Sequence, residues 1–65
     1  MSKKEVLLGE FTAVIDLAEV LDVPAARVIE AGFQRAGLLL TIHEDVAFEA
    51  AVLIAAEFGF HARRR

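Results

Sequence analysis

The side chains most able to do chemistry are His43, Glu44 and Asp45, which are consecutive, and His61 near the end of the chain. Imidazole and carboxylate groups bind metals or transfer protons when several of them converge on one point. Consecutive residues of a loop point in different directions, whereas metal sites draw ligands from separated positions. We therefore interpret this run as a polar turn next to a helix cap, and we predict no metal site.

Nucleophilic catalysis is equally poorly supported. The hydroxyl residues are Ser2, Thr12 and Thr41, and there is no cysteine. A nucleophile needs a base within reach, and no constellation of residues supplies such a pair. Nothing in the sequence resembles a glycine loop that cradles phosphates. The sequence therefore predicts that the protein is not an enzyme, that it has no catalytic residues and that it needs no cofactor.

Length and composition predict one small domain over residues 1–65, with a core at about 5–60 and basic ends at 1–4 and 61–65. No apolar run resembles a signal peptide or approaches the ~20 residues that span a bilayer. We therefore expect a cytoplasmic protein that does not enter membranes. As many as 57% of the residues are apolar, which is a large share for a chain with so little interior, and contiguous exposed apolar patches usually mark contacts.

Charge is separated along the chain. Five basic residues, Lys3, Lys4 and 63–65, lie at the ends, whereas the body holds ten acids against only Arg27 and Arg35. An acidic body repels a phosphate backbone, whose attraction to lysine and arginine supplies most non-specific nucleic-acid affinity. Nucleic acid or the ribosome is therefore a disfavoured partner, although the basic ends could still touch phosphate.

The pattern of apolar residues predicts an α+β fold: a small three-helix domain with a helix-turn-helix-like pair and two or three short strands. Residues 5–11 read as a strand, with a helical turn as the alternative. Thr12, Asp22 and Asp45 are the side chains expected to cap the three helices. The other expected elements are a first helix whose apolar face is Val14, Leu17, Ala18 and Leu21, a second from about Pro24 to Arg35 ended by Gly37, a buried strand over 38–42, a third helix over 46–58 ended by Gly59, and a brief strand over 60–62.

The third helix has an unusual pattern. Its only polar residues are Glu49 and Glu57, which share one face with Leu53 between them. The apolar arc covers more than half of the circumference, although a surface helix needs only about 100°. Alanine accounts for part of this arc because it is the best helix former, but it does not account for the large apolar residues. We therefore predict a protein interface, most simply that of a homodimer.

Three blocks of sequence, "LAEVLDVPAARVIEA", "GLLLTI" and "FEAAVLIAAEFG", resemble the N-terminal domain of bacterial translation initiation factor 2. The matching positions cover roughly residues 12–60 and are Leu17, Ala18, Glu19, Val23, Val28, Ile29, Gly37, Thr41, Ile42, Glu49, Ala51, Leu53, Ala55, Glu57 and Gly59. The resemblance implies a compact α+β fold and an accessory, non-catalytic module associated with ribosome contact and protein partners. It also implies that the GTPase of the family lies in a different domain.

The chain departs from the family at several positions. The second helix carries one residue more than the usual spacing, His43 replaces a common asparagine, and Ala47 replaces an aspartate that opens the third helix. Lysines that family members often carry are replaced by Ile15, Val20 and Glu30. The loss of basic residues weakens the case for RNA or ribosome binding, and the gain of apolar ones strengthens the case for a protein interface.

Two functions follow from these patterns. The favoured one is a non-enzymatic interaction module that associates with itself or docks a protein partner through apolar residues of the first and third helices: Ile15, Val20, Phe48, Val52 and Leu53. Its affinity would come from buried apolar area, to which aromatic anchors contribute most. The alternative is a small nucleic-acid-binding protein whose second helix reads bases or RNA structure and whose basic ends bind phosphate. The residues expected to make these contacts are Arg27, Gln34, Arg35, Arg63, Arg64 and Arg65.

Overall fold

The computed structural model describes residues 4–65 of the chain. This part contains three helices and four strands in two small sheets, so the predicted α+β class is confirmed. In order, the elements are β1 (Lys4–Leu8), β2 (Phe11–Ala13), α1 (Val14–Leu21), α2 (Ala25–Ala36), β3 (Asp45–Ala47), α3 (Phe48–Glu57) and β4 (Phe60–Arg64). No helix over these residues is long and apolar enough to cross a membrane.

Strands β2 and β3 pair antiparallel, and each runs directly into a helix, β2 into α1 and β3 into α3. The ladder is extended at both ends by the first backbone groups of these helices. The N–H of Val14 donates to the carbonyl of Glu44 (2.9 Å), and the N–H of Phe48 donates to the carbonyl of Glu10 (2.9 Å). The N–H groups of a first helical turn have no partner within the helix, so this strand pair stabilises the starts of both helices.

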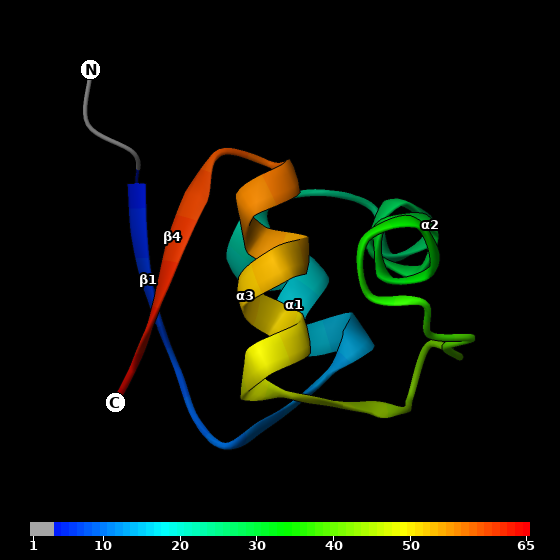
Figure 1. Ribbon diagram of the computed structural model, residues 1–65, viewed down its shortest axis with the longest axis horizontal. Coiled ribbons are helices and arrows are strands. Elements are labelled where there is room, and N and C mark those ends of the chain that lie inside the picture. The colour runs from blue at the N-terminus through cyan, green and yellow to red at the C-terminus, as the bar shows by residue number, and fades with distance from the viewer. Residues whose placement is uncertain (1–3) are drawn as a thin grey trace.

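Strands β1 and β4 form the second sheet, a parallel pair in which Val6 is the partner of Ala62. Both of these side chains are buried and face the helices. Helix α3 packs against β4 and also against α2, while α1 packs against α2. In Figure 1 the sheet lies along one side of the molecule and α2, seen end-on, lies at the opposite side.

The core lies between the β1–β4 sheet and the three helices. Its largest fully buried side chains come from almost every element and are Leu8, Leu17, Leu21, Ile54, Val14, Val28 and Val46. All four apolar residues predicted for the first helix are buried. No side-chain nitrogen or oxygen of the described residues is buried without a hydrogen-bond partner.

The connection between α1 and α2 is a tight turn over residues 22–24. Asp22 has a positive φ of 59° and its N–H closes the end of α1 on the carbonyls of Ala18 and Glu19. Aspartate is among the few residues other than glycine that adopt this left-handed conformation readily. Pro24 then precedes the first residue of α2, and Gly37 ends that helix with a φ of 68°.

The prediction of three side-chain caps was wrong. None of the helices has a capping side-chain hydrogen bond, and the residues that precede them are Ala13, Pro24 and Ala47. Thr12 and Asp45, two of the predicted caps, lie instead within β2 and β3. Backbone carbonyls of distant segments replace the capping oxygens, because the two strands bring those carbonyls to the starts of α1 and α3.

The strand predicted over residues 38–42 was also wrong, because this apolar run is irregular. It pairs with no strand within residues 4–65, and only Leu40 of its apolar residues packs closely between helices. Leu39 is 82% exposed. The run supports α1 through its backbone, since the carbonyl of Ile42 accepts from the N–H of Ile15 (3.0 Å).

Three other elements begin or end at residues that differ from the predicted ones, because of strand pairing. The segment predicted as one strand over 5–11 is divided between β1 and β2 by Gly9 and Glu10. Val46, predicted as the start of the third helix, lies in β3, and α3 begins at Phe48. The brief last strand extends to Arg64, so most of the basic end predicted over residues 61–65 is part of the sheet.

Gly32 allows the close approach of α2 to the loop that follows it. A Cβ atom at this position would lie 2.6 Å from Cδ1 of Leu40 and 3.5 Å from Cδ1 of Ile54. The first distance is shorter than any real contact, so a side chain here would displace Leu40 from the gap between α2 and α3. This packing explains a glycine inside a helix, where it costs about 1 kcal/mol relative to alanine.

We predict that Gly32→Ala and Leu40→Ala are strongly coupled. Leu40→Ala alone should destabilise the domain by about 1–2 kcal/mol because it removes a half-buried side chain. Gly32→Ala should be neutral or destabilising in the natural sequence, but stabilising by up to about 1 kcal/mol in the Leu40→Ala background, where only the helix preference remains. Urea denaturation of the natural sequence, the two single variants and the double variant measures this coupling. Equal effects of Gly32→Ala with Leu40 and with Ala at position 40 would contradict it.

Candidate protein interface

Large apolar side chains are exposed on several elements. Those with more than two-fifths of their surface exposed are Leu7, Phe11, Ile15, Val20, Phe33, Leu39, Ile42 and Leu53. Single exposed apolar residues are common on soluble proteins and need no explanation. A candidate interface therefore needs an organised setting around such a residue, and among these eight we find it at Leu53.

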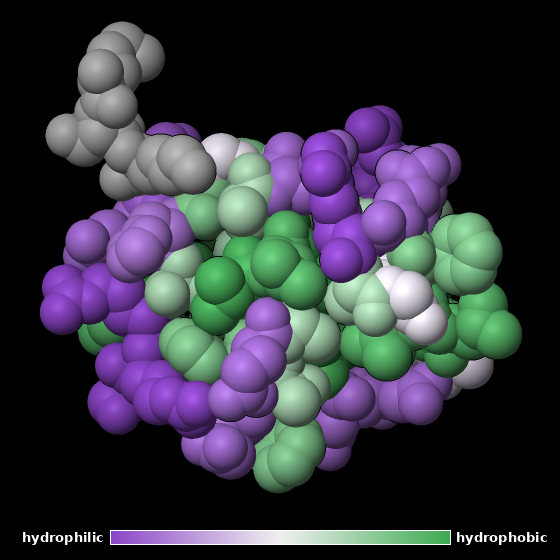
Figure 2. All heavy atoms as spheres, viewed as in Figure 1, coloured by the Kyte–Doolittle hydropathy of each residue, from purple (hydrophilic) through white to green (hydrophobic). Residues whose placement is uncertain are grey.

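Leu53 lies on the outer face of α3, which we call the α3 ridge and define as Glu49, Leu53, Ala56 and Glu57. All four residues are exposed, and their spacing of four, three and one places them along one side of the helix. Figure 2 shows an apolar area over α3 that is bordered by hydrophilic side chains. The predicted arrangement of Leu53 between two glutamates on one face is thus confirmed.

An arginine from α2 holds the C-terminal end of the α3 ridge. Nε of Arg35 donates to Oε1 of Glu57 over 2.6 Å. Together with Leu53 and Ala56, these two residues line a shallow hollow in the surface. The hollow therefore has an apolar lining from Leu53, Ala56 and the stem of Arg35, and its charged groups, the guanidinium of Arg35 and the carboxylate of Glu57, are already paired with each other.

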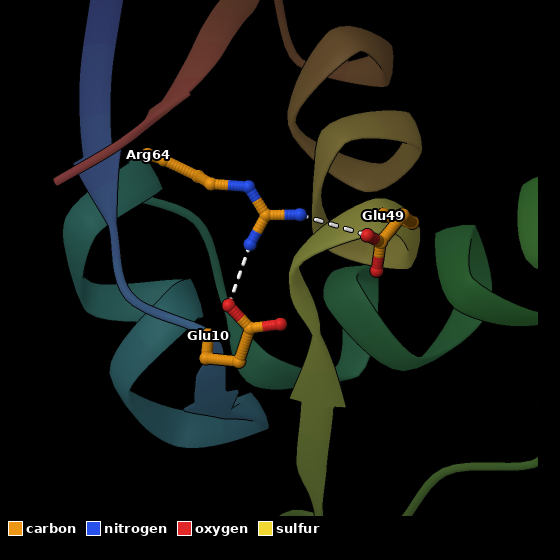
Figure 3. Close-up of polar contacts among 3 residues, drawn as sticks. All are labelled: Glu10, Glu49 and Arg64. Atoms are coloured by element: carbon orange, nitrogen blue, oxygen red, sulfur yellow. Dashed lines mark hydrogen bonds and ion pairs between the residues drawn. The ribbon is translucent and has the colours of Figure 1, made fainter.

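A second arginine, from β4, holds the N-terminal end of the ridge. Arg64 donates from Nη2 to Glu49 (2.8 Å) and from Nη1 to Glu10 (2.6 Å), so its guanidinium joins two carboxylates from different segments (Figure 3). The same guanidinium lies over the ring of Phe48, with 4.3 Å between Cζ and the ring centroid. A cation over an aromatic face is attracted by the ring's quadrupole, and here it also covers the ring.

The structure separates the five residues that the sequence predicts for an interface. Leu53 is 47% exposed and belongs to the α3 ridge. Phe48 and Val52 are half-buried and pack against the core. Ile15 and Val20 are exposed on α1, but five residues turn a helix by about 140° beyond a full turn, so these two do not share one row of the helix.

Four of the arginines predicted to contact nucleic acid are paired with carboxylates. Besides Arg35 and Arg64, Arg27 lies 3.5 Å from Glu30 and Arg63 lies 3.5 Å from Glu5. Gln34 is exposed on α2, and Arg65 makes no ion pair with a described residue. Each of these exposed pairs is weak, but together they lower the positive charge that these residues can present to phosphate.

The polar run at residues 43–45 forms part of a turn. A carboxylate oxygen of Glu44 accepts from the N–H of Thr41 (3.1 Å), and the N–H of Glu44 donates to the carbonyl of Thr41 (3.1 Å). Asp45 lies in β3. Over residues 4–65 there is no group of three histidine or acidic side chains that could hold a metal ion.

The sequence did not assign Glu10 or Ala56 to a site, and it assigned Arg64 only to nucleic-acid contact. Glu10 and Arg64 are far apart in the chain, and nothing in their spacing indicates that they meet. Ala56 could have been found, because it follows Leu53 by three residues and so lies on the same side of α3. The spacing of Glu49 and Glu57 predicted which face of α3 is exposed. That Arg64 and Arg35 pair with these glutamates is visible only in the folded structure.

By its elements, residues 4–65 form a small α+β module with an exposed helix face at the α3 ridge. Comparison with known proteins identifies relatives that share this stretch of sequence. The chain is 44% identical over 59 residues, 91% of its length, to translation initiation factor IF-2 of Aquifex aeolicus, and 44% identical over 59 residues to IF-2 of Desulforamulus reducens. It is 41% identical over 58 residues to IF-2 of Syntrophus aciditrophicus. No family model matches the chain.

The chain is therefore related to a segment of translation initiation factor IF-2, as its sequence blocks predict. The chain spans only about 7% of the length of the Aquifex relative.

We predict that Arg64→Ala destabilises the domain by about 1 kcal/mol, because it removes two exposed charge pairs and uncovers the Phe48 ring. Arg64→Lys should recover only part of this loss, since a lysine cannot reach two carboxylates and lie flat on a ring together. Thermal unfolding followed by circular dichroism measures the effect. Arg65→Ala is the matched control and should change stability by less than about 0.5 kcal/mol; equal effects of the two alanine variants would contradict the bridging role.

Proposed function

We propose that this domain is a non-enzymatic interaction module of the translation machinery, working in the cytoplasm, and that it docks a protein partner through the α3 ridge. The observation that carries the proposal is the position of Leu53, exposed between two glutamates that are each held by an arginine from another element. The relationship to IF-2 supports the translation setting.

The organisation of the ridge suits docking energetically. An exposed leucine and alanine at the centre offer apolar area, and burial of such area stabilises a complex by roughly 25 cal/mol per Å². The flanking arginines and glutamates already hold one another in the free domain, so little side-chain entropy is lost when a partner covers them. An apolar centre with a polar rim is the usual anatomy of a protein interface.

Charge indicates the kind of partner. At the N-terminal end of the ridge two glutamates share one arginine, and the body between Glu5 and Ala62 holds ten acids against two arginines. We therefore propose a basic protein surface with an apolar centre, because complementary potentials speed association and fix orientation. Leu53 is the proposed central contact, Phe48 and Val52 support the ridge from beneath, and Ile15 and Val20 are proposed contacts outside it.

Binding to ribosomal proteins freed of RNA tests this proposal. We expect the immobilised domain to retain a basic ribosomal protein, and we expect Leu53→Asp to weaken that binding at least about tenfold, since it places a charge at the buried centre. The matched control is Leu39→Asp, which alters a more exposed leucine outside the ridge and should bind like the natural domain. Equal binding by both variants would exclude the α3 ridge as the docking surface.

The alternative proposal is a nucleic-acid binder that uses Arg27, Gln34, Arg35 and the residues 63–65. The ion pairs of four of these arginines speak against it, because each pair must open before phosphate can be bound. We expect no RNA binding by fluorescence anisotropy at about 100 mM salt. Salt-dependent binding that disappears after deletion of residues 63–65 would instead support the alternative.

A further inference from the structure

The β1–β4 sheet has an unusual form. It is parallel and only two-stranded, although parallel sheets are normally covered on both faces. Val6 and Ala62 face the core, whereas Glu5, Leu7, His61 and Arg63 are exposed on the other face. Leu7 is 57% exposed. Figure 1 shows β1 at the outside of the molecule, with α3 on the β4 side of the sheet.

The outer edge of β1 carries unpaired backbone groups. Along a strand the backbone groups of successive residues point to opposite sides. The carbonyl of Leu8 accepts from the N–H of Arg65 (3.1 Å), so Leu8 and Val6 point their backbone groups toward β4. Glu5 and Leu7 then point theirs away from β4. No strand of residues 4–65 lies on that side, and within these residues neither of the two makes a further backbone hydrogen bond there. Such an edge is a template for another strand.

We propose that a second copy of this chain pairs with that edge, β1 against β1 in antiparallel orientation about Val6. This register places Glu5 opposite Leu7 of the second copy, and the reverse, as two hydrogen-bonded pairs that exchange about four backbone hydrogen bonds. The result is a four-stranded sheet with a two-fold axis at Val6, which closes after two copies.

The side chains of β1 are compatible with this self-pairing. Lys4 falls opposite Leu8 of the second copy, so no like charges oppose each other directly. The two Leu7 side chains become diagonal neighbours on the outer face and cover each other. The two Glu5 side chains are diagonal neighbours on the same face, and each keeps Arg63 as its partner within its own copy, so the pairing leaves neither glutamate without a cation.

Strand β4 cannot pair with itself in the same way. About Ala62, His61 would stand opposite Arg63 of the second copy, and two Arg63 side chains would be diagonal neighbours. Charged residues are a common protection of edge strands, and β4 carries this protection whereas residues 6–8 of β1 lack it. The pairing of two copies proposed here therefore uses β1 and not the helix residues from which self-association was predicted, and it leaves the α3 ridge free for a different protein.

Sedimentation equilibrium of the natural chain tests the proposal. We expect a monomer–dimer equilibrium between about 10 µM and about 1 mM, because an interface of one short strand is small and transient. Leu7→Lys should raise the dissociation constant at least about tenfold, since it places two lysines side by side next to Arg63. Leu39→Lys is the matched control and should leave the dissociation constant unchanged.

Amide hydrogen exchange of the natural chain gives a second measurement that needs no variant. The N–H groups of Glu5 and Leu7 should exchange more slowly as concentration rises, whereas those of α3 should not change. A chain that stays monomeric up to about 1 mM, or a dimer that Leu53→Lys weakens and Leu7→Lys does not, would overturn the proposal. A dimer in which the N–H groups of Glu5 and Leu7 exchange at the same rate at every concentration would overturn it as well.

Discussion

The structure depends on the backbone hydrogen bonds that join the starts of α1 and α3 to segments distant in the sequence. Each of these helices begins directly after a short strand, and each lacks a capping side chain. Their first N–H groups would be unsatisfied without the carbonyls of Glu10, Ile42 and Glu44. The pairing of β2 with β3 is therefore more than a minor sheet, because it fixes where two helices begin and how they lie relative to each other.

Glu10 connects this constraint to the proposed docking surface. Its carbonyl receives the first N–H of α3, and its carboxylate receives Arg64, which also holds Glu49 and covers Phe48. The end of β4 is thereby attached to the start of α3. Side chains that are already held in this way lose little conformational entropy when a partner covers them, which supports the proposed docking at the α3 ridge.

The apolar excess of the chain is distributed in two ways. Alanines and mid-sized residues of α3, such as Ala51, Ala55 and Ile54, are fully buried in the core. Phe48, by contrast, is half-buried, since it packs against the core on one side and lies beneath the guanidinium of Arg64 on another. In a chain that is 57% apolar, part of the apolar surface is thus covered by the stems of charged side chains.

The sequence by itself determined the features that depend on local spacing: the three helices, the buried face of α1, the turn before Pro24, the end of α2 at Gly37 and the outward face of α3 around Leu53. The relationship to IF-2 was also visible, because three blocks in the right order are specific. Only the tertiary structure decided which segments cap the helices, that residues 38–42 form no strand, and that Arg64 bridges Glu10 and Glu49. The physical reason is that caps, strand pairs and ion pairs join residues that are distant along the chain, and no spacing within one segment records which distant backbone group will be its neighbour.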